Sequence, residues 1–279
     1  MDLTGYFDPV SLTKPEYFLL PDKDTFSRNI TIHTPDQPLK EVEKYDVAII
    51  GLPEEKGGVV KGSALAPDHV RGMLYQLRKI NNLKIYDLGN LIITENINNT
   101  YYAVRDITLE LVENNILPVF IGGSNDLGYG VLLALEKINT LSQIVSIDPR
   151  LDLTLDFKEK TSSRNYLNHL FDEAFKNKYT FSNIGHQTYY ITEDQIDSLE
   201  NEFMLGIRLG EARNNISALE PVIRDSDFFI VDMSAVKQSD SPGVSIPSPN
   251  GFNGDEICAL SRYAGMSDGL QAFGLFEVT

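Results

Sequence analysis

Three aspartates follow stretches of apolar residues that we interpret as buried strands, and together they could hold a divalent cation. Asp148 ends the predicted strand Ile144–Asp148, with Asp152 four residues further on, and Asp232 ends the apolar run FFIVD. Carboxylates at a strand end suit a hard metal ion or acid–base catalysis. Such an aspartate can also simply cap a helix or close a turn. Three of them at the ends of two strands make a functional site about as well supported as a purely structural role.

A glycine-rich stretch, GGSNDLGYG at residues 122–130, follows the apolar run LPVFI and opens a predicted helix. A turn of this kind can bind phosphate at the helix N-terminus. Its spacing matches neither G-x-G-x-x-G nor the phosphate loop with its lysine. The signal for nucleotide binding is therefore weak, and a tight turn with a capping serine or asparagine is the more ordinary interpretation.

The histidines and the single cysteine offer no second site. None of the four histidines lies in an HExxH motif or beside a cysteine, and we expect packing or surface roles for them: His33, His69, His169 and His186. The single cysteine, Cys258, excludes an internal disulfide framework and a multi-cysteine zinc site.

The elements that must position the aspartates alternate between strands and helices. Predicted strands cover Tyr45–Gly51, Lys84–Leu88, Pro118–Gly122, Ile144–Asp148, Phe203–Ile207, Phe228–Met233 and Leu270–Val278. Amphipathic helices are predicted at Pro67–Lys79, Tyr101–Asn114, Leu127–Lys137, Ser217–Arg224 and Gly254–Tyr263. This alternation predicts an α/β fold with a mainly parallel sheet, whose active site lies at the carboxyl ends of the strands. We expect one domain over residues 1–279, with residues 1–43 as an N-terminal arm or edge element.

The composition of the chain argues against some classes of binding partner. The formal net charge of −16 argues against nucleic acid or an anionic membrane as a partner, because both require clustered Lys and Arg. No apolar stretch approaches the ~18 residues of a membrane span. The first residues, MDLTGYFDPV, do not resemble a signal peptide, and we expect a cytoplasmic protein.

The strand-end segments, taken in order, resemble the ureohydrolase (arginase/agmatinase/formiminoglutamase) family from about residue 44 onward. YDVAIIGLP is similar to the first strand and loop of that family, and GSALAPDHVR to its G-x-x-x-x-P-x-x-I-R segment. The later counterparts are LPVFIGGSND for G-G-D-H-S, SIDPRLDL for D-A-H-x-D, FFIVDMSAVKQSDSPG for S-x-D-x-D-x-x-D-P, and GLFEV for E-V-N-P. The resemblance implies an arginase-like three-layer α/β/α fold.

The resemblance also implies a metal centre, of which this chain retains only part. The family binds two Mn²⁺ that bridge a hydroxide, which attacks a guanidino or amidine carbon. The six ligand positions carry the retained Asp148, Asp152 and Asp232, and the altered Asn125, Arg150 and Ser234. Asparagine and serine are weak donors, and an arginine places a permanent cation where a metal should bind.

Two further positions follow from the resemblance. The substrate-side glutamate of the last motif is retained as Glu277. The later S-H-G motif has only a loose counterpart, Ser163-Arg164-Asn165, with arginine in place of histidine.

These departures lead us to expect a ureohydrolase-fold protein without the binuclear manganese centre, one that binds a small molecule or a protein partner without catalysis. The alternative is a metal-dependent hydrolase of linear amidine or guanidine C–N bonds, with Mn²⁺ held by the three aspartates. A nucleotide-binding protein is a third hypothesis, from fold analogy alone. No cofactor is expected in the first case, and a homo-oligomer is expected by analogy with the family.

Arg150 separates the first two hypotheses. Three crowded carboxylates repel one another, so we expect the Arg150 guanidinium to lie among them and bind at least one of Asp148, Asp152 and Asp232. Its removal should then cost about 3–5 kcal/mol of stability, because buried negative charge is left unpaired. If Arg150 instead turns away, an acidic pocket remains that can take one cation.

Restoring the family ligands should restore metal binding. The triple variant Asn125→His, Arg150→His and Ser234→Asp should bind Mn²⁺ far more tightly than the natural chain, because each change introduces a better donor. Single changes should do little while Arg150 opposes the cation. Titration calorimetry with Mn²⁺ measures the difference, and unchanged binding would mean that the pocket itself has been remodelled.

Overall fold

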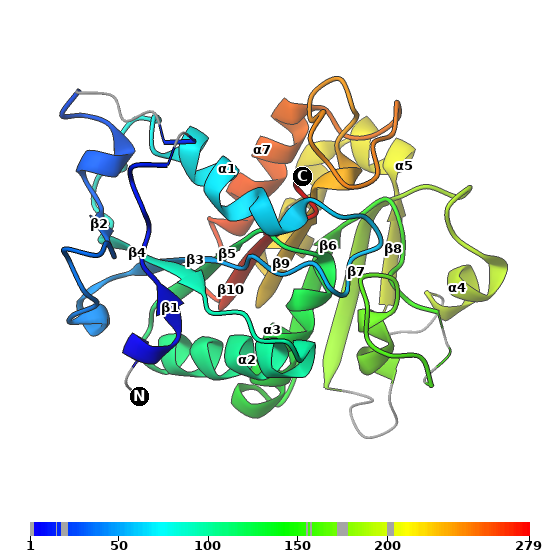
Figure 1. Ribbon diagram of the computed structural model, residues 1–279. Coiled ribbons are helices and arrows are strands. Elements are labelled where there is room, and N and C mark those ends of the chain that lie inside the picture. Colours follow the sequence, from blue (N-terminus) through cyan, green and yellow to red (C-terminus); the bar gives the residue numbers. More distant parts are fainter. Residues whose placement is uncertain are drawn as a thin grey trace.

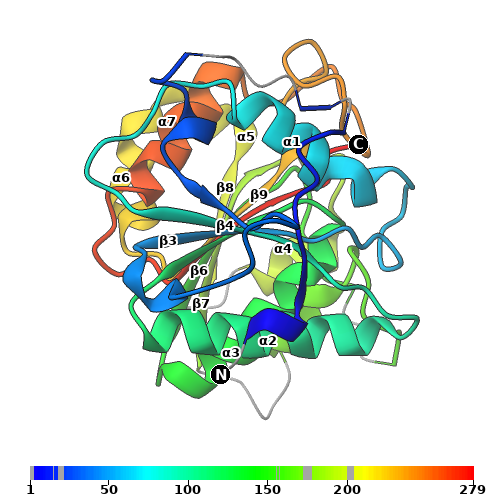
Figure 2. The same cartoon turned by 60° about the vertical axis from the view of Figure 1, so that its left-hand side comes forward.

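The computed structural model describes residues 3–14, 16–17, 22–154, 156, 158–171, 178–199 and 204–279. These residues form a ten-stranded sheet with helices packed on both faces, as two views of the chain show (Figure 1, Figure 2). The predicted three-layer α/β/α architecture is confirmed. Among the described residues, no helix has the length and apolar character needed to cross a bilayer.

The sheet is parallel except at one edge. Its strands are β1 (Phe7–Asp8), β2 (Thr31–Ile32), β3 (Val47–Gly51), β4 (Ile85–Leu91), β5 (Leu117–Ile121), β6 (Ser142–Ile147), β7 (Tyr179–His186), β8 (Met204–Arg208), β9 (Phe228–Asp232) and β10 (Ala272–Phe276). They lie in the order β1-β4-β3-β5-β10-β9-β6-β7-β8, and β2 also pairs with β4. Only β1 runs antiparallel to its neighbour. The N-terminal segment thus supplies two short edge strands, β1 and β2.

The helices form the two outer layers. They are α1 (Ala66–Leu74), α2 (Ile97–Glu113), α3 (Gly128–Ile138), α4 (Glu193–Ser198), α5 (Leu209–Asn214), α6 (Glu220–Arg224) and α7 (Gly254–Ala264). Helices α2 and α3 lie on one face of the sheet, and α1, α6 and α7 lie on the other (Figure 2). Residues at the N-termini of two helices favour the start of the helix there. Pro67 occupies the first turn of α1, and Asn253 and Glu256 form a capping box at α7.

Apolar side chains fill the space on both faces of the sheet. The cluster under α2 and α3 includes Val104, Phe120 and Leu132, all fully buried. The cluster under α6 and α7 includes Phe229 and Leu260, also fully buried. Phe228 and Phe229 of β9 therefore face opposite layers, which explains why this strand is apolar at nearly every position.

The predicted strands and helices match the structure apart from their ends, but α4, α5 and β7 were not predicted, and β1 and β2 were expected only as an arm or edge element. Strand β7 was not predicted, because YTFSNIGH mixes polar with apolar residues even though all but Thr180 are buried. The helix expected through Lys79 ends at Leu74 and continues only as turns. Strand β10 stops at Phe276, because Glu277 has a left-handed backbone with φ of 63°.

A fully buried ion pair joins α1 to the edge of the sheet. Arg71 donates from Nε and Nη2 to the two carboxylate oxygens of Asp87, at 2.8 and 2.9 Å, and both side chains are inaccessible to solvent. The guanidinium also donates to Asn90 and to the Gly89 carbonyl, and Tyr75 donates to Asp87. Every charge in this network is matched inside the chain, as buried ions require.

Breaking this pair should destabilise the fold strongly. Arg71→Leu leaves the Asp87 carboxylate buried without its cation, and we expect the free energy of unfolding to fall by about 3–5 kcal/mol in urea titrations. Adding Asp87→Asn removes the unpaired charge and should recover part of the loss. Arg78→Leu, which removes an exposed arginine paired with Asp22, is the matched control and should leave the urea midpoint unchanged. If Arg71→Leu and Arg78→Leu lowered the free energy of unfolding equally, this account would be refuted.

Candidate functional site

Four adjacent strands bring the candidate residues together. Strands β5, β10, β9 and β6 are neighbours in the sheet and run parallel. The chain leaving β5 carries Asn125, the end of β9 carries Asp232, and Glu277 follows β10 directly. Asp148 and Asp152 follow β6. Because all four strands end at the same edge, residues far apart in sequence meet there, as the sequence predicted.

The three aspartates form one cluster. One carboxylate oxygen from each of Asp148, Asp152 and Asp232 lies within 4.8 Å of the others, and all three residues are buried. Two of them also close local turns: Asp148 Oδ1 accepts a hydrogen bond from the Arg150 N–H, and Asp232 Oδ1 accepts one from the Ser234 N–H, both at 2.7 Å. Asp148 and Asp232 therefore close turns and also belong to the cluster, so a structural role and a functional role do not exclude one another.

Burial makes the charged form of the cluster costly. Desolvation, followed by the charges of Asp152 and Asp232, raises the pKa of Asp148 well above its usual range. Desolvation raises the pKa of Asp152 to about 6, against hydrogen bonds that favour its charged form. Desolvation and then the charge of Asp152 raise the pKa of Asp232 to about 7. The effect of burial therefore outweighs the charges of Arg164 and Arg150, which lower the pKa values of Asp152 and Asp232 respectively.

Asn125 bridges the aspartates from β5. Its Nδ2 donates to Asp152 Oδ2 at 2.8 Å and makes a longer contact of 3.4 Å with Asp148 Oδ2. Its other amide atom, Oδ1, is buried without a hydrogen-bond partner. A buried polar atom without a partner is unfavourable. Here it marks an oxygen next to the carboxylate cluster that could bind a cation.

Glu277 reaches the same place from β10. It is a buried residue with a left-handed backbone, which costs a non-glycine residue about 1–2 kcal/mol. Its Oε1 accepts a hydrogen bond of 2.8 Å from the Asn125 N–H. Desolvation, followed by the charge of Asp232, raises its pKa to about 7. Backbone strain that aims a carboxylate at a cluster of carboxylates is typical of functional sites.

A cavity of about 20 Å³ lies between these carboxylates and the surface, enough for a single water or ion. Its lining consists of Val59, Arg150, Asp152, Ser163, Arg164, Asp232, Ser234, Ile246 and Glu277. Arg164, which the sequence alignment placed only loosely, therefore lies at the site. Its charge lowers the pKa of Asp152, against the larger effect of burial.

Arg150 does not bind the aspartates, contrary to the expectation from sequence. Its guanidinium carbon lies 4.1 Å from the centre of the Tyr190 ring, a cation–π contact. Within the described part of the chain, no ion pair joins it to any of the three aspartates. The prediction was wrong because sequence adjacency to Asp148 says nothing about the aromatic ring that the chain beyond β7 brings alongside.

Sequence reasoning also missed Asn183, which lies in the unpredicted strand β7. Its Nδ2 donates to the Arg150 carbonyl at 2.8 Å, and more weakly to the Asp148 carbonyl at 3.4 Å. Its Oδ1 contacts His186 Nδ1 at 3.0 Å. Asn183 thus fixes the loop that carries Asp148 and Asp152. A polar residue inside an otherwise buried strand was the available signal.

The glycine-rich turn is structural. Its four backbone N–H groups, at residues 122–125, donate to the carbonyls of Leu275, Ser63 and Glu54 and to the side chain of Glu277. None remains for a phosphate, so the turn gives no support to nucleotide binding. Gly123, with φ of 74°, is required here, because a Cβ would lie 2.6 Å from the Glu54 carbonyl oxygen.

None of the four histidines belongs to the aspartate cluster. His33 and His186 are buried, and His69 is exposed on α1. Burial, followed by the charge of Arg208, lowers the pKa of His186 to about 4, so this side chain is neutral. His169 packs against the ring of Tyr129, with ring centres 5.1 Å apart.

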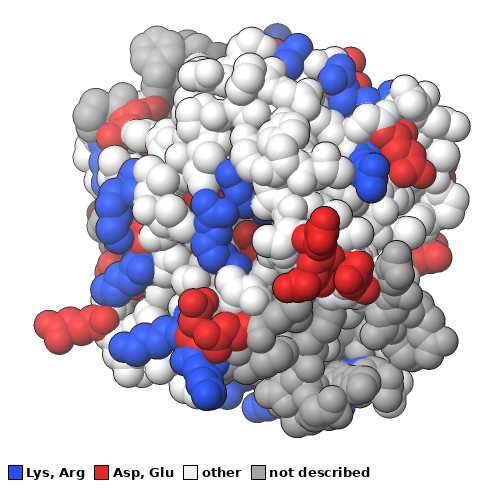
Figure 3. Space-filling model, turned by 90° about the vertical axis from the view of Figure 1, so that its right-hand side faces the viewer, with Lys and Arg blue, Asp and Glu red and all other residues white. Residues whose placement is uncertain are grey.

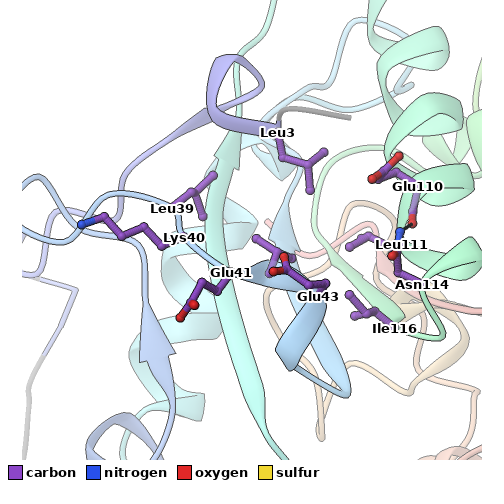
Figure 4. A pocket seen from close by; sticks show the side chains of 10 residues that line it. Leu3, Leu39, Lys40, Glu41, Glu43, Glu110, Leu111, Asn114 and Ile116 are labelled. Carbon is purple, nitrogen blue, oxygen red and sulfur yellow. Dashed lines mark hydrogen bonds between the residues drawn. The ribbon is translucent and has the colours of Figure 1, made fainter.

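Besides a hollow of about 660 Å³ that is lined by residues of α6 and by Asp268 and Gly269, two more of the larger hollows lie away from the aspartates. One, of about 320 Å³, lies at the amino ends of β3 and β5, the opposite edge of the sheet; Leu3, Leu39, Glu43, Glu110 and Ile116 are among its lining residues (Figure 4). The other, of about 590 Å³, lies beside the carboxyl ends of β7 and β8 and includes Arg208 and Arg213. Figure 3 shows the face on the β8 side, where Lys and Arg side chains gather near the middle.

The chain belongs to the arginase family, whose model matches residues 45–279. Among curated proteins, it is 27% identical over 259 residues to the formimidoylglutamase of Staphylococcus carnosus, covering 86% of this chain and 82% of the relative. It is 24% identical to the formimidoylglutamase of Halobacterium salinarum, covering 85% and 81%. The sequence-based resemblance to the ureohydrolases is therefore confirmed.

Solved structures share the fold. The formimidoylglutamase of Bacillus subtilis matches with a TM-score of 0.80 at 19% identity, over 93% of this chain and 86% of that chain. The formiminoglutamase of Trypanosoma cruzi, solved with Mn²⁺, matches with a TM-score of 0.78 at 22% identity, over 86% and 88%. The proclavaminate amidino hydrolase of Streptomyces clavuligerus matches with a TM-score of 0.75 at 21% identity, over 95% and 90%.

The raised pKa values predict how the metal-free protein responds to pH. Carboxyls with folded pKa values of about 6 to 7, above about 4 in the unfolded chain, stabilise the fold while protonated, and this contribution is lost as pH rises through 6 to 7. Asp148→Asn removes one charge from the cluster and keeps the acceptor for the Arg150 N–H. In EDTA it should be more stable than the natural chain by about 1–3 kcal/mol at pH 8. Near pH 5 the difference should be small.

Urea unfolding at both pH values measures this prediction. Asp227→Asn, at the sheet end remote from the cluster, is the control, since the Asp227 carboxylate accepts a hydrogen bond from the Gln143 N–H and does not belong to the cluster. A loss of stability in Asp148→Asn at pH 8 would show that the cluster is already neutralised.

Proposed function

We propose that this chain is a metal-dependent hydrolase of a linear amidine C–N bond, of the formimidoylglutamase type. It would use one divalent cation, Mn²⁺ by preference, bound by Asp148, Asp152 and Asp232. In the reaction the oxygen of water adds to the amidine carbon, and the C–N bond then breaks to leave an amine and an amide. This is the alternative that the sequence left open, and it now has better support than a non-catalytic binding protein.

The observation that carries the proposal is the uncompensated aspartate cluster. Three buried carboxylates converge within 4.8 Å, and the Arg150 cation that was expected to neutralise them lies on the Tyr190 ring instead. Hydrophobic side chains of similar size would cost far less to bury. The main argument for a non-catalytic protein was an arginine occupying the metal position. That argument is weaker because the guanidinium forms no ion pair with the three aspartates and contacts the Tyr190 ring, although Arg150 still lines the cavity beside Asp152 and Asp232.

The donor set fits one divalent cation. Carboxylate oxygens suit Mn²⁺, and Asn125 adds an amide oxygen that has no partner. Ser234, in place of the sixth ligand, is a weak neutral donor, and its N–H is committed to Asp232. The cavity of about 20 Å³ also matches a single ion. Formimidoylglutamases are among the relatives, and the T. cruzi formiminoglutamase was solved with Mn²⁺.

The chain's own side chains would prepare the amidine for attack. A bound cation supplies a hydroxide-like water near neutral pH. Glu277, in the same cavity, presents a carboxyl group with a pKa of about 7, so it can accept a hydrogen bond from the amidine nitrogen and hold or release a proton. Val59 and Ile246 add apolar surface to the lining of the cavity.

Hydrolysis by the manganese-loaded protein tests the proposal. Protein purified with Mn²⁺ should release formamide from N-formimidoyl-glutamate, measured by chromatography, and EDTA should abolish the release. Asp232→Asn should lower the rate by more than about 100-fold, since loss of a ligand weakens metal binding at least as much as loss of a residue that orients a ligand. Asp227→Asn, at the other end of the same strand, should retain the rate.

Electron paramagnetic resonance on the same samples measures the metal site directly. One Mn²⁺ per chain predicts the spectrum of an isolated ion, and a coupled pair of ions would contradict the single-ion site. If Mn²⁺ does not bind, or binds while neither amidines nor guanidines are hydrolysed, the hydrolase assignment fails and the non-catalytic hypothesis returns.

A further inference from the structure

Hydrogen bonds hold the backbone of Arg150 in place, and only its side chain can change position. Its N–H donates to Asp148 Oδ1 at 2.7 Å, and its carbonyl accepts from Asn183 at 2.8 Å. The residue therefore cannot leave the loop between Asp148 and Asp152. Its guanidinium, at the end of a long flexible stem, can still take up more than one position.

Tyr190 offers one of these positions. The guanidinium carbon lies 4.1 Å from the ring centre, and the ring itself is held by its neighbours. Tyr189 packs edge-on against it, with ring centres 4.6 Å apart, and the Tyr190 N–H donates to the Gln187 carbonyl at 2.8 Å. Gln187 in turn exchanges hydrogen bonds of 3.2 and 3.3 Å with Asn250. The ring is thus a fixed surface built by two loops.

The aspartate cavity offers the other position. Arg150 lines that cavity together with Asp152 and Asp232, and it lies close enough for its charge to act on Asp232. An arginine fork can bind two carboxylates through separate edges. A tethered guanidinium at this distance has a high effective concentration and would compete with a dissolved cation for the same oxygens. In the structure the guanidinium lies against the Tyr190 ring instead.

We propose that Tyr190 is a positioning residue, which holds the Arg150 guanidinium out of the aspartate cluster and so keeps that cluster free for a divalent cation. The Arg150 guanidinium would then compete with the metal for the aspartates. It can lie either on the Tyr190 ring or among the aspartates, but not in both positions at once. The inference rests on the proposed metal-dependent function, but the behaviour of Arg150 can be measured without metal.

A double-mutant cycle in metal-free protein tests the position of Arg150. The four proteins are the natural chain, Tyr190→Leu, Arg150→Gln and the double variant, unfolded by urea in EDTA at about pH 8. In the natural background Arg150→Gln loses a cation–π contact and the effect of its charge on Asp232, but no ion pair, and the unfolding constant should rise by less than about fivefold. In the Tyr190→Leu background the guanidinium has entered the cluster, and the same substitution should raise the constant by more than about tenfold. Equal effects in both backgrounds would overturn the proposal.

Mn²⁺ titration calorimetry tests the consequence for the metal. Tyr190→Leu should bind Mn²⁺ about tenfold more weakly than the natural chain. Tyr190→Phe keeps the ring and should bind like the natural chain, and adding Arg150→Gln to Tyr190→Leu should restore the affinity. Weak binding that persists in the double variant would show that Tyr190 acts through the loop structure alone, and the proposal would fail.

The two proposals can fail separately. Absence of Mn²⁺ binding by the natural chain would refute the metal-dependent function, while the metal-free cycle would still decide where Arg150 lies. Conversely, tight Mn²⁺ binding by both the natural chain and Tyr190→Leu would leave the hydrolase intact and refute the role of Tyr190. Circular dichroism of each variant confirms that it is folded.

Discussion

The burial of three carboxylates at one edge of the sheet is the constraint on which the rest of the site depends. Asp148, Asp152 and Asp232 lie within 4.8 Å of one another and away from solvent, where like charges repel strongly and hydration is lost. The fold accepts this cost because two of the aspartates also close the turns that end β6 and β9. Local turn chemistry and a site for a cation are therefore built from the same atoms.

The contrast with the Arg71–Asp87 pair shows what distinguishes a functional cluster from a structural one. Both are fully buried, but Asp87 receives both arms of a guanidinium and the hydroxyl of Tyr75. The aspartate cluster has no ion pair with a cation among the described residues, although Arg150 and Arg164 line the adjoining cavity, and the nearby amide oxygen Asn125 Oδ1 has no hydrogen-bond partner. Buried titratable groups with raised pKa values that lack such a partner are candidates for a functional site.

The three positions that differ from the ligand set of the family differ from it to different degrees. Asn125 occupies the position of an imidazole and still contacts two of the aspartates. Ser234 supports Asp232 through its backbone N–H and lines the cavity. Arg150 has left the metal position for the Tyr190 ring. By the sequence resemblance, Asn125 and Ser234 are neutral donors at ligand positions, and the guanidinium of Arg150 lies on the Tyr190 ring at the wall of the cavity, without an ion pair to the aspartates. For this reason a metal-dependent hydrolase has better support than a non-catalytic protein.

The sequence by itself determined the class of fold, most of the strands and the convergence of the three aspartates. Runs that are apolar at every position are typical of strands covered on both faces, and parallel strands bring their carboxyl ends to one edge. The sequence left β7 hidden, because Asn183 and His186 are polar residues whose partners are not visible in a local pattern.

Only the tertiary structure decided where the Arg150 side chain lies. A guanidinium beside two aspartates in sequence has several carboxylates and one aromatic ring within reach. Which of them it contacts depends on the loop that places Tyr190 next to it, and that loop is held by Gln187 and Asn250. Neighbouring residues in the sequence determine where the backbone of such a residue lies. The position of its charged end is set by contacts between distant parts of the chain, and a local pattern does not contain them.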